Sequence, residues 1–564
     1  MGIWKLKHRH ADDLIEHLLI DRGITGESRL AFLSPDYDAH TNDPNLFHEI
    51  GKAIDRLKAT LAQHELIYIF ADYDADGTCG AAVLLDTFEK LGHKEVVVAQ
   101  PDRNHEGYGL SLPYVDAAIT SGARVLITVD CGVTALEEIT HAEANGISVI
   151  VLDHHTVPPV WPNATAILNP KRPGESYPYA GICGTACAFK LAQALIREYP
   201  DKAPLGWEKW LLDLVAIATV ADMVPLTGEN RTLLTYGLQV LARTRREGLR
   251  ALMREAGVDQ SRVNATDIGF SIAPRINAAS RLAHASLALA LLTAKNKEEA
   301  EAIALKLEDL NTDRKQITDA ALRDAHGQVL SGDTEGEVIV VGSEAWNPGI
   351  LGLVAGRLAD TYGKPTFVWG GTGDEYKGSC RSGGGVNVVD LMTRAGGEGL
   401  FKHFGGHFAS GGFSIARNRI GELTPALAHG MKGLVGEFPF TQEVLLDAEL
   451  QLSMVHDQFL RELTRLSPFG MENPAPVFLL RGVVPERIST FGATSNHLRM
   501  QFLDGRKKIS AVGFGLGGQR VATLTGPLDI AALVEENVWL GRREVRLRLV
   551  DVRLSSDHVI VGNS

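Results

Sequence analysis

The chain is organised around residues 66–77, which read Leu66-Ile67-Tyr68-Ile69-Phe70-Ala71-Asp72-Tyr73-Asp74-Ala75-Asp76-Gly77. A β-branched and aromatic run that ends in three carboxylates predicts a buried strand followed by an acidic loop. Side chains two residues apart in extended backbone point the same way, so Asp72, Asp74 and Asp76 can converge on one point. Such carboxylates repel one another unless a cation lies between them, and a hard divalent ion suits oxygen ligands. For a single Asp-x-Asp, an acidic surface turn is the competing interpretation.

The sequence around this stretch alternates between strand and helix patterns. Gly77 permits a tight turn, and Thr78 can begin a helix that runs from Cys79 to Leu91. Further strands are predicted along the chain, with helices between them. The alternation implies an α/β fold with a parallel sheet covered by helices on both faces. The expected strands are 66–70, 95–99, 125–129 and 147–152.

Size and composition narrow the class of protein. A chain of 564 residues predicts about two to four domains, and 45% hydrophobic with 22% charged residues is typical of a soluble globular protein. No apolar stretch is long enough to span a membrane, and the N-terminus lacks an apolar signal core. The five cysteines lack paired C-x2-C spacing, which favours reduced thiols over a zinc site. We therefore expect a cytoplasmic protein.

The net charge limits the partners. A formal charge of −13 argues against a surface coated with basic residues for duplex DNA, although an acidic metal centre would supply several of these charges. Arginines still cluster at 243–254 and at 542–553. A solvated helix or strand face remains the default interpretation of each cluster.

Two of the later predicted strands also end in polar side chains. Asp130 follows the third strand, and Asp153, His154 and His155 follow the fourth. The carboxyl ends of parallel strands lie along one edge of an open sheet, where ligands bind, so these side chains should meet the acidic loop. Asp222 follows another apolar segment and needs a partner, for which a metal is suitable. A helix cap for a lone Asp and a core role for a lone His are the competing interpretations.

These motifs resemble those of the DHH phosphoesterase superfamily, whose members carry two divalent metals, usually Mn2+ or Mg2+. The four motifs are Asp72-Tyr73-Asp74-Ala75-Asp76-Gly77, Val129-Asp130-Cys131-Gly132, Asp153-His154-His155 and Ala221-Asp222. Three later segments are similar to the RecJ family within that superfamily, bacterial exonucleases that degrade single-stranded DNA from the 5′ end. They are Arg275-Ile276-Asn277-Ala278-Ala279-Ser280-Arg281-Leu282, Gly405-Gly406-His407-Phe408-Ala409-Ser410-Gly411 and Ser467-Pro468-Phe469-Gly470-Met471-Glu472-Asn473-Pro474. One departure is Phe70-Ala71, where many superfamily members have a ligand His.

The resemblance implies a set of metal ligands. They are Asp74, Asp76, Asp130, His154 and Asp222, with Asp76 and Asp130 shared between two ions. It places Asp72 and His155 beside the ligands, where they orient a ligand or contact the scissile phosphate, and it lets Asp153 orient the histidines. Two ions roughly 3.5–4 Å apart would lower the pKa of a bound water and clamp the phosphate oxygens.

The resemblance also implies a pocket for a 5′ phosphate. The segment 378–385 is predicted to be a loop whose hydroxyl, guanidinium and backbone N–H groups suit a phosphate, with a flexible turn as the alternative. In RecJ-like proteins the residues matching Ser379, Arg381 and Arg103 grip the phosphate. The other residues implied in substrate binding are Arg275, Asn277, Arg281, Gly405, Gly406 and His407, the last three in a loop of the DHHA1 domain.

The last part of the chain changes pattern. From about residue 445, short alternating segments separated by glycines predict a small β-barrel. Arginines alternate with apolar residues over 545–550, so one face can be core and the other basic, as in an OB-fold that follows a single-stranded backbone. RecJ-like proteins have an OB-fold here. The predicted domains are an N-terminal helical segment (1–50), a DHH catalytic domain (51–285), a connecting helix (286–330), a DHHA1 domain (331–440) and an OB-fold domain (441–564).

The function expected from this resemblance is 5′-to-3′ hydrolysis of single-stranded DNA to 5′-mononucleotides by a two-metal centre, in DNA repair and recombination. A single-strand binding protein and a RecQ-type helicase are the expected partners. Two alternatives remain open. One is a DHH phosphoesterase acting on short oligonucleotides, cyclic dinucleotides or pyrophosphate, and the other is a non-catalytic DHH-like replication subunit.

Overall fold

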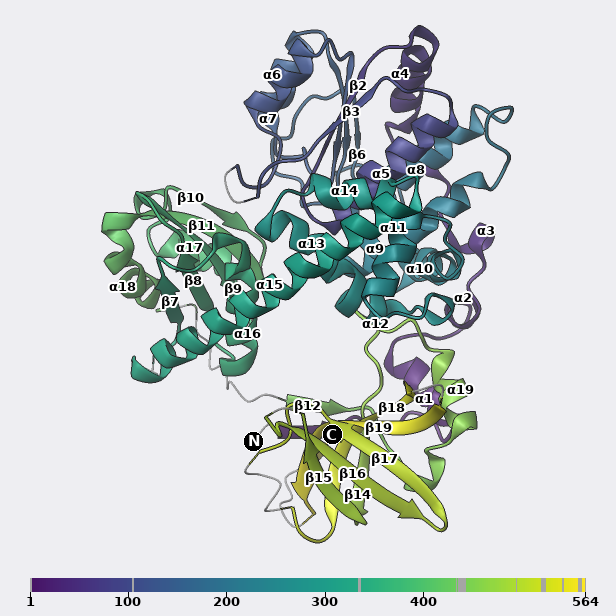
Figure 1. The fold of residues 1–564 in the computed structure, drawn as a ribbon, viewed down its shortest axis with the longest axis vertical. Coiled ribbons are helices and arrows are strands. Elements are labelled where there is room, and N and C mark those ends of the chain that lie inside the picture. Colours follow the sequence, from purple (N-terminus) through teal and green to yellow (C-terminus); the bar gives the residue numbers. More distant parts are fainter. Residues whose placement is uncertain are drawn as a thin grey trace. The chain divides into compact units, whose positions relative to one another are not determined.

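The computed structural model describes residues 3–103, 106–332, 336–432, 434, 443–492, 494–518, 524–539, 542–555 and 560–562 (Figure 1). The chain forms two compact units. The larger contains Thr41–Val224 and Thr232–Phe440, and the smaller contains Met1–His40, Pro225–Arg231 and Thr441–Ser564. Among the helices described, none has the length and apolar character needed to cross a bilayer.

The larger unit begins with a parallel sheet in the order β3-β2-β4-β5-β6. Every residue of the central strand β2 is buried, which explains why it reads as a continuous apolar run rather than an alternating one. The predicted parallel sheet is thus confirmed. Its strands are β2 (Ile67–Ala71), β3 (Val96–Ala99), β4 (Val125–Val129), β5 (Ser148–Leu152) and β6 (Ala166–Leu168).

Helices cover both faces of this sheet (Figure 1). On one face α6 and α7 pack against aromatic and β-branched side chains of β2, β4 and β5. On the other face lie α4, α5 and α8, and α5 packs against α8 and α9. These helices are α4 (Ile50–Gln63), α5 (Ala75–Lys90), α6 (Leu112–Thr120), α7 (Leu136–Ala144), α8 (Gly184–Arg197) and α9 (Leu212–Ala221). The next are α10 (Gly228–Leu241), α11 (Glu247–Glu255), α12 (Ala265–Asp267), α13 (Ala273–Leu282) and α14 (Ser286–Thr293).

The long helix α15 (Lys297–Ser331) leads to a second sheet in the same unit. This sheet has the order β10-β11-β9-β8-β7, and only β7 and β8 pair in parallel. Helices α15 and α16 pack on one face, and α17 and α18 on the other. The elements are β7 (Ile339–Ser343), α16 (Leu351–Tyr362), β8 (Thr366–Gly370), β9 (Glu375–Arg381), α17 (Val388–Arg394), β10 (His403–Gly406), β11 (Ser410–Ala416) and α18 (Ile420–Met431).

The smaller unit joins the two ends of the chain. Strand β1 (Ile3–Leu6), which the helical patterns of the N-terminus did not predict, lies between β12 (Glu443–Leu446) and β20 (Ile560–Gly562). Its other sheet has the order β13-β14-β18-β19-β17-β16-β15. These strands are β13 (Ala448–Glu449), β14 (Phe478–Val483), β15 (Arg487–Phe491), β16 (His497–Asp504), β17 (Lys507–Gly513), β18 (Leu528–Trp539) and β19 (Arg542–Leu554). The helices are α1 (Leu14–Asp21), α2 (Ser28–Leu33), α3 (Tyr37–His40) and α19 (Asp457–Thr464).

The predicted alternation along β19 is present, but its basic face is partly neutralised. Leu547 and Leu549 are buried in the core of the sheet. Arg546 and Arg548 point away from that core, and both form ion pairs with Glu535 of the neighbouring strand β18, at 2.8 and 3.1 Å. Cross-strand pairing, which the local pattern does not reveal, therefore lowers the positive charge available on this strand.

Candidate active site

Asp74 and Asp76 lie at the start of helix α5 rather than in an extended loop. Asp74 caps the helix, and its carboxylate accepts hydrogen bonds from the backbone N–H groups of Asp76 (2.8 Å) and Gly77 (3.2 Å). The prediction of an acidic loop with a helix beginning at Thr78 was therefore wrong, because Asp is a favoured cap and ends the extended backbone early. Gly77 serves close packing instead of a turn, since a Cβ there would lie 2.4 Å from the backbone oxygen of Asp72.

The carboxylate of Asp76 is held by the N-terminus of α8. Its two oxygens accept hydrogen bonds from the backbone N–H groups of Gly184 and Thr185, both at 2.7 Å. The first N–H groups of a helix have no partner within the helix and favour an anion, so this contact orients Asp76. Gly184 also has no room for a side chain, because a Cβ would lie 2.7 Å from that of Asp130. Sequence reasoning missed this role of α8.

His154 lies at the centre of the acidic groups. Its Nε2 is 3.2 Å from Asp130 Oδ1, 3.4 Å from Asp222 Oδ2 and 3.8 Å from Asp76 Oδ2. Asp130 and His154 follow β4 and β5, while Asp222 is the C-terminal cap of α9. The predicted meeting of these four residues is present in the fold. Asp72, Asp74 and Asp130 form an adjoining group whose ligand atoms lie within 4.8 Å of one another.

The cluster has the properties of a divalent metal site. Four buried atoms have no hydrogen-bond partner among the described residues, namely Asp72 Oδ1, Asp130 Oδ1, His154 Nδ1 and His154 Nε2. A buried polar group without a partner is costly, and cations would satisfy the carboxylate oxygens and the unprotonated nitrogen of His154. Carboxylates with a single imidazole suit Mn2+ or Mg2+ better than a thiolate-seeking ion. Asp130 is also held at a φ of 61°, a strained conformation for a residue with a side chain.

The electrostatics of the cluster favour a cation. Burial, and then repulsion from neighbouring carboxylates, raises the pKa of Asp72, Asp74, Asp130 and Asp222. Burial lowers the pKa of His154 to about 4, so its imidazole is neutral and able to act as a ligand. These crowded carboxylates would be fully ionised only with a cation beside them, and otherwise they would tend to take up protons.

Asp153 organises the two histidines. It accepts hydrogen bonds from the backbone N–H groups of Val133 (2.9 Å), His154 (2.7 Å) and His155 (3.0 Å), and its Oδ1 is 2.8 Å from His155 Nδ1. Burial alone would raise the pKa of Asp153, but these hydrogen bonds and the charge of His155 lower it to about 2. The ionised Asp153 in turn raises the pKa of His155 despite burial. The ring of His155 is therefore fixed with a proton on Nδ1.

Two residues from elsewhere in the unit contact His155. The hydroxyl of Tyr108 donates to the backbone oxygen of Asp130 (3.0 Å) and lies 3.0 Å from His155 Nδ1. Sequence reasoning missed Tyr108, although its position between Gly107 and Gly109 in a loop was visible. His407, which follows β10, stacks its ring on His155 with centroids 5.7 Å apart. The second sheet thus contributes a side chain beside the cluster.

Three guanidinium groups gather next to this cluster. Arg381 Nη1 donates to Ser379 Oγ (3.0 Å) and to the backbone oxygen of Cys380 (2.8 Å). Arg103 lies over the ring of Tyr73 at 4.7 Å, and Arg281 donates to the backbone oxygen of Gly349 (2.8 Å). Burial, followed by repulsion among these arginines, lowers the pKa of Arg281 to about 9 and lowers that of Arg381. Such crowding of like charge favours an anion between the groups.

The remaining predicted substrate residues have structural partners. Arg275 is buried, donates to the backbone oxygen of Ser271 (2.7 Å) and pairs with Glu308 of α15. Asn277 accepts a hydrogen bond from the backbone N–H of Ala75 (2.8 Å), which positions the start of α5.

Other segments differ from their predicted form. The segment 378–385 is not simply a loop, because 378–381 belong to β9 and pair with β11. Gly405 and Gly406 end β10. Gly406 has a φ of 144° and a Cβ there would lie 2.4 Å from Ser410 O, whereas Gly405 has open space.

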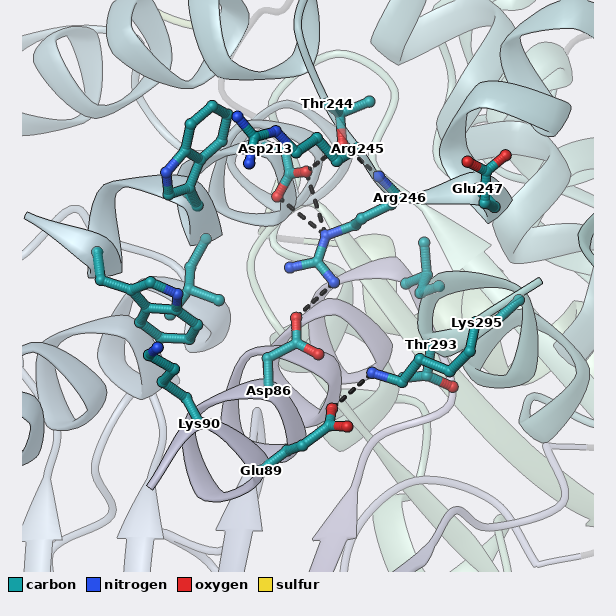
Figure 2. Close-up of a pocket in the computed structure, with 15 residues that line it drawn as sticks. Asp86, Glu89, Lys90, Asp213, Thr244, Arg245, Arg246, Glu247, Thr293 and Lys295 are labelled. Atoms are coloured by element: carbon teal, nitrogen blue, oxygen red, sulfur yellow. Dashed lines mark hydrogen bonds and ion pairs between the residues drawn. The ribbon is translucent and has the colours of Figure 1, made fainter. Parts of the chain in front are cut away.

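A separate cavity of about 620 Å³ lies at the other ends of α5 and α9 (Figure 2). Figure 2 shows Arg246 reaching between Asp86 of α5 and Asp213 of α9. The distances are 2.5 Å from Nη1 to Asp86 Oδ2 and 3.1 Å from Nε to Asp213 Oδ2. Burial lowers the pKa of Arg246, but the two carboxylates outweigh this effect and raise it. The arginine therefore ties together two helices whose opposite ends carry Asp76 and Asp222.

Comparison with known proteins identifies the family. Family models match residues 66–219 (DHH family, N-terminal domain), 335–432 (DHHA1 domain) and 446–551 (RecJ OB domain). The single-stranded-DNA-specific exonuclease RecJ of Bacillus subtilis is 34% identical over 550 residues, which cover 97% of this chain and 68% of the relative. This chain belongs to the RecJ family. The RecJ of Dickeya dadantii is 32% identical, with 90% of each chain covered.

Solved RecJ structures have the same fold. The Thermus thermophilus RecJ in complex with Mn2+ matches with a TM-score of 0.83 and 28% identity, covering 99% of this chain and 80% of that one. An exonuclease RecJ bound to manganese matches with a TM-score of 0.60 and 31% identity, covering 69% and 97%. The predicted fold class, with DHH, DHHA1 and OB domains, is confirmed. The exact domain boundaries stay predictions.

Proposed function

We propose that this chain is a single-stranded-DNA-specific exonuclease that removes nucleotides from the 5′ end and releases 5′-mononucleotides. The observation that carries the proposal is the buried arrangement of Asp76, Asp130 and Asp222 around His154, in a chain that belongs to the RecJ family. The same membership supports a cytoplasmic role in DNA repair and recombination, with a single-strand binding protein and a RecQ-type helicase as partners.

The chemistry assigned to this site is metal-assisted hydrolysis of a phosphodiester. The residues that would hold two Mn2+ or Mg2+ ions are Asp74, Asp76, Asp130, His154 and Asp222. When bound, such ions lower the pKa of a water and neutralise the phosphate oxygens. Asp130 belongs to two of the three groups of potential ligands in this cluster, with His154 and His155 in one and with Asp72 and Asp74 in the other, which supports a position shared between the ions.

The other residues of the site have positioning and proton-holding roles. Asp153 keeps the Nδ1 proton of His155 engaged, so a further proton on that ring resides on Nε2, where it can be donated to a phosphate oxygen. Tyr108 and His407 fix the plane of the same ring. Asp72, buried beside Asp74, completes the negative surface that attracts the ions.

We assign the 5′-to-3′ direction of degradation to the three clustered arginines beside the acidic site. Arg103, Arg281 and Arg381, with Ser379, offer charged and neutral donors that suit a terminal phosphate. Gly352 keeps this place open, because a Cβ there would lie 3.0 Å from Arg381 Nη2 and 3.2 Å from Ser379 Oγ. A phosphate held at a fixed distance from the metal ligands would present the first phosphodiester bond for cleavage, which yields mononucleotides.

One assay separates the proposal from its alternatives. With Mn2+ present, we expect the full chain to release nucleotides from the 5′ end of a long single strand labelled at either terminus, and to leave duplex DNA intact. Turnover of pyrophosphate or dinucleotides without attack on the long strand would favour a small-molecule phosphoesterase. No hydrolysis of any of these substrates would favour a non-catalytic subunit.

A further inference from the structure

A second group of metal-binding side chains lies at the opposite edge of the parallel sheet. His64 ends helix α4 just before β2, while His93 and Glu95 lie just before β3. Because β2 and β3 are parallel neighbours with Ile67 opposite Val96, these two chain segments lie side by side. Ligand atoms of His64, His93 and Glu95 all lie within 4.8 Å of one another.

His93 is the residue that indicates a ligand here. Its side chain is buried, with 3% exposure, and neither ring nitrogen makes a hydrogen bond of normal geometry within the described part of the chain. An imidazole buried in this state is unfavourable, because both nitrogens lose their contacts with water. A metal ion bound to one nitrogen would remove most of that cost.

The separation of His93 and Glu95 suits a tetrahedral ion. His93 Nδ1 lies 3.6 Å from Glu95 Oε2. Two ligands of a tetrahedral zinc ion, each about 2.1 Å from the metal, are about 3.4 Å apart. The backbone of Glu95 and of Glu65 makes weaker hydrogen-bonding contacts with the His93 ring, and one of them can hold the non-coordinating nitrogen.

The nearby carboxylate of Glu65 already has an ion-pair partner. Glu65 Oε2 lies 2.7 Å from Arg56 Nη1, so this side chain is held by an ion pair. His64 and Glu95 are exposed, which gives an ion access from solvent and leaves room for a water as fourth ligand. Two imidazoles and one carboxylate favour Zn2+ over Mg2+, which prefers oxygen ligands alone.

We propose that His64, His93 and Glu95 bind one Zn2+ ion, with water as the fourth ligand, and that this ion fastens the end of α4 to the start of β3. The site is distinct from the acidic cluster, since β2 separates the two and five strand residues span roughly 16 Å. The proposed ion lies away from every residue assigned to hydrolysis, so we expect it to affect stability rather than nuclease activity.

The test counts metal in the full chain. Wild type, His64→Ala and Glu95→Gln are each incubated with excess Zn2+, freed of unbound metal by gel filtration and analysed by mass spectrometry for zinc per chain. We expect each variant to hold about one zinc fewer than wild type. The acidic cluster is unchanged in all three proteins, so any zinc bound there cancels in the difference.

A matched control and a second readout accompany this count. His141 is another exposed histidine beside one carboxylate, with Nε2 at 2.9 Å from Asp116 Oδ1, but among the described residues it belongs to no group of three potential ligands. His141→Ala should hold as much zinc as wild type. Zn2+ should also raise the melting temperature of wild type more than that of either variant, because only wild type gains the extra ion. Equal zinc contents in wild type, His64→Ala and Glu95→Gln would overturn the proposal.

Discussion

Replacing Asp76 should damage both the chemistry and the fold, whereas replacing Asp130 should damage the chemistry alone. The carboxylate of Asp76 accepts two hydrogen bonds of 2.7 Å from the N-terminus of α8. Asp76→Ala leaves the buried N–H groups of Gly184 and Thr185 without this acceptor. Asp130 differs, because its Oδ1 is buried with no hydrogen-bond partner among the described residues.

The magnitude follows from these contacts. Each charge-assisted hydrogen bond contributes about 1.5–3 kcal/mol, so losing two costs about 3–6 kcal/mol. Removing one of several crowded carboxylates also relieves repulsion, which offsets part of this cost. We therefore expect the free energy of unfolding of metal-free Asp76→Ala to be about 2–4 kcal/mol lower than that of wild type. For a domain of this kind, that loss lowers the melting temperature by roughly 4–8 °C. Asp130→Asn preserves the shape and relieves repulsion among the crowded carboxylates, so its free energy of unfolding should stay within about 0.5 kcal/mol of the wild-type value.

Thermal unfolding in EDTA, monitored by circular dichroism, measures the stability difference, and Mn2+-dependent release of nucleotides from single-stranded DNA measures activity. Both variants should lose activity by about 10²-fold or more, since each removes a proposed metal ligand. Only Asp76→Ala should melt earlier. A metal-free Asp76→Ala protein as stable as wild type would refute the role of Asp76 in anchoring α8.

Three further outcomes are expected. Arg381→Ala should reduce the preference for 5′-phosphorylated over 5′-hydroxyl strands by about 10-fold or more, as the loss of a charged hydrogen bond implies. Arg357 is an exposed arginine of α16 paired with an aspartate, and Arg357→Ala should leave this preference unchanged. If competition assays found the same preference in Arg381→Ala as in wild type, the phosphate pocket would be contradicted. Tyr108→Phe should lower kcat by roughly 10-fold and change the melting temperature by no more than a few degrees. The reason is that the substitution removes only the hydroxyl beside Asp130 and His155. A wild-type kcat in this variant would argue against a positioning role for Tyr108. Arg246→Met removes the guanidinium that forms ion pairs with Asp86 and Asp213 (Figure 2) and should destabilise the larger unit by about 3–5 kcal/mol. Chemical denaturation would detect this loss, and an unchanged midpoint would show that the ion pairs contribute little.

The local sequence pattern was sufficient to predict those helices and strands whose hydrophobic periodicity is unambiguous. The strand before Asp72 was predictable because parallel strands buried on both faces are continuous apolar runs. Most of the connecting helix predicted over 286–330 was predictable too, as α15 (Lys297–Ser331), although the structure separates α14 (Ser286–Thr293) from its start. The start of α5 was not, because the same aspartates can line an extended loop or cap a helix, and only the contact of Asp76 with α8 distinguishes the two.

At the candidate site, too, some residues could be predicted from the sequence and others only from the structure. Asp130, His154 and Asp222 could be proposed from their positions after apolar segments and from family motifs. The roles of Tyr108 and of Gly184 could not, because neither carries a motif and each acts through a contact with a residue distant in sequence. Arg275 had a family motif in its favour, yet the fold engages it with Glu308 on the long helix.

The sequence by itself determined the parallel sheet and the residues at its carboxyl edge, because hydrophobic periodicity and strand polarity are local properties of the chain. Tertiary structure alone decided which atoms meet: the N–H groups that hold Asp76, the ring that stacks on His155, and the imidazole of His93 placed beside His64 and Glu95 at the opposite edge. Hydrogen bonds and ligand geometries depend on distances of a few ångströms between remote segments. Those distances are set by how helices and strands pack, which no single stretch of sequence encodes.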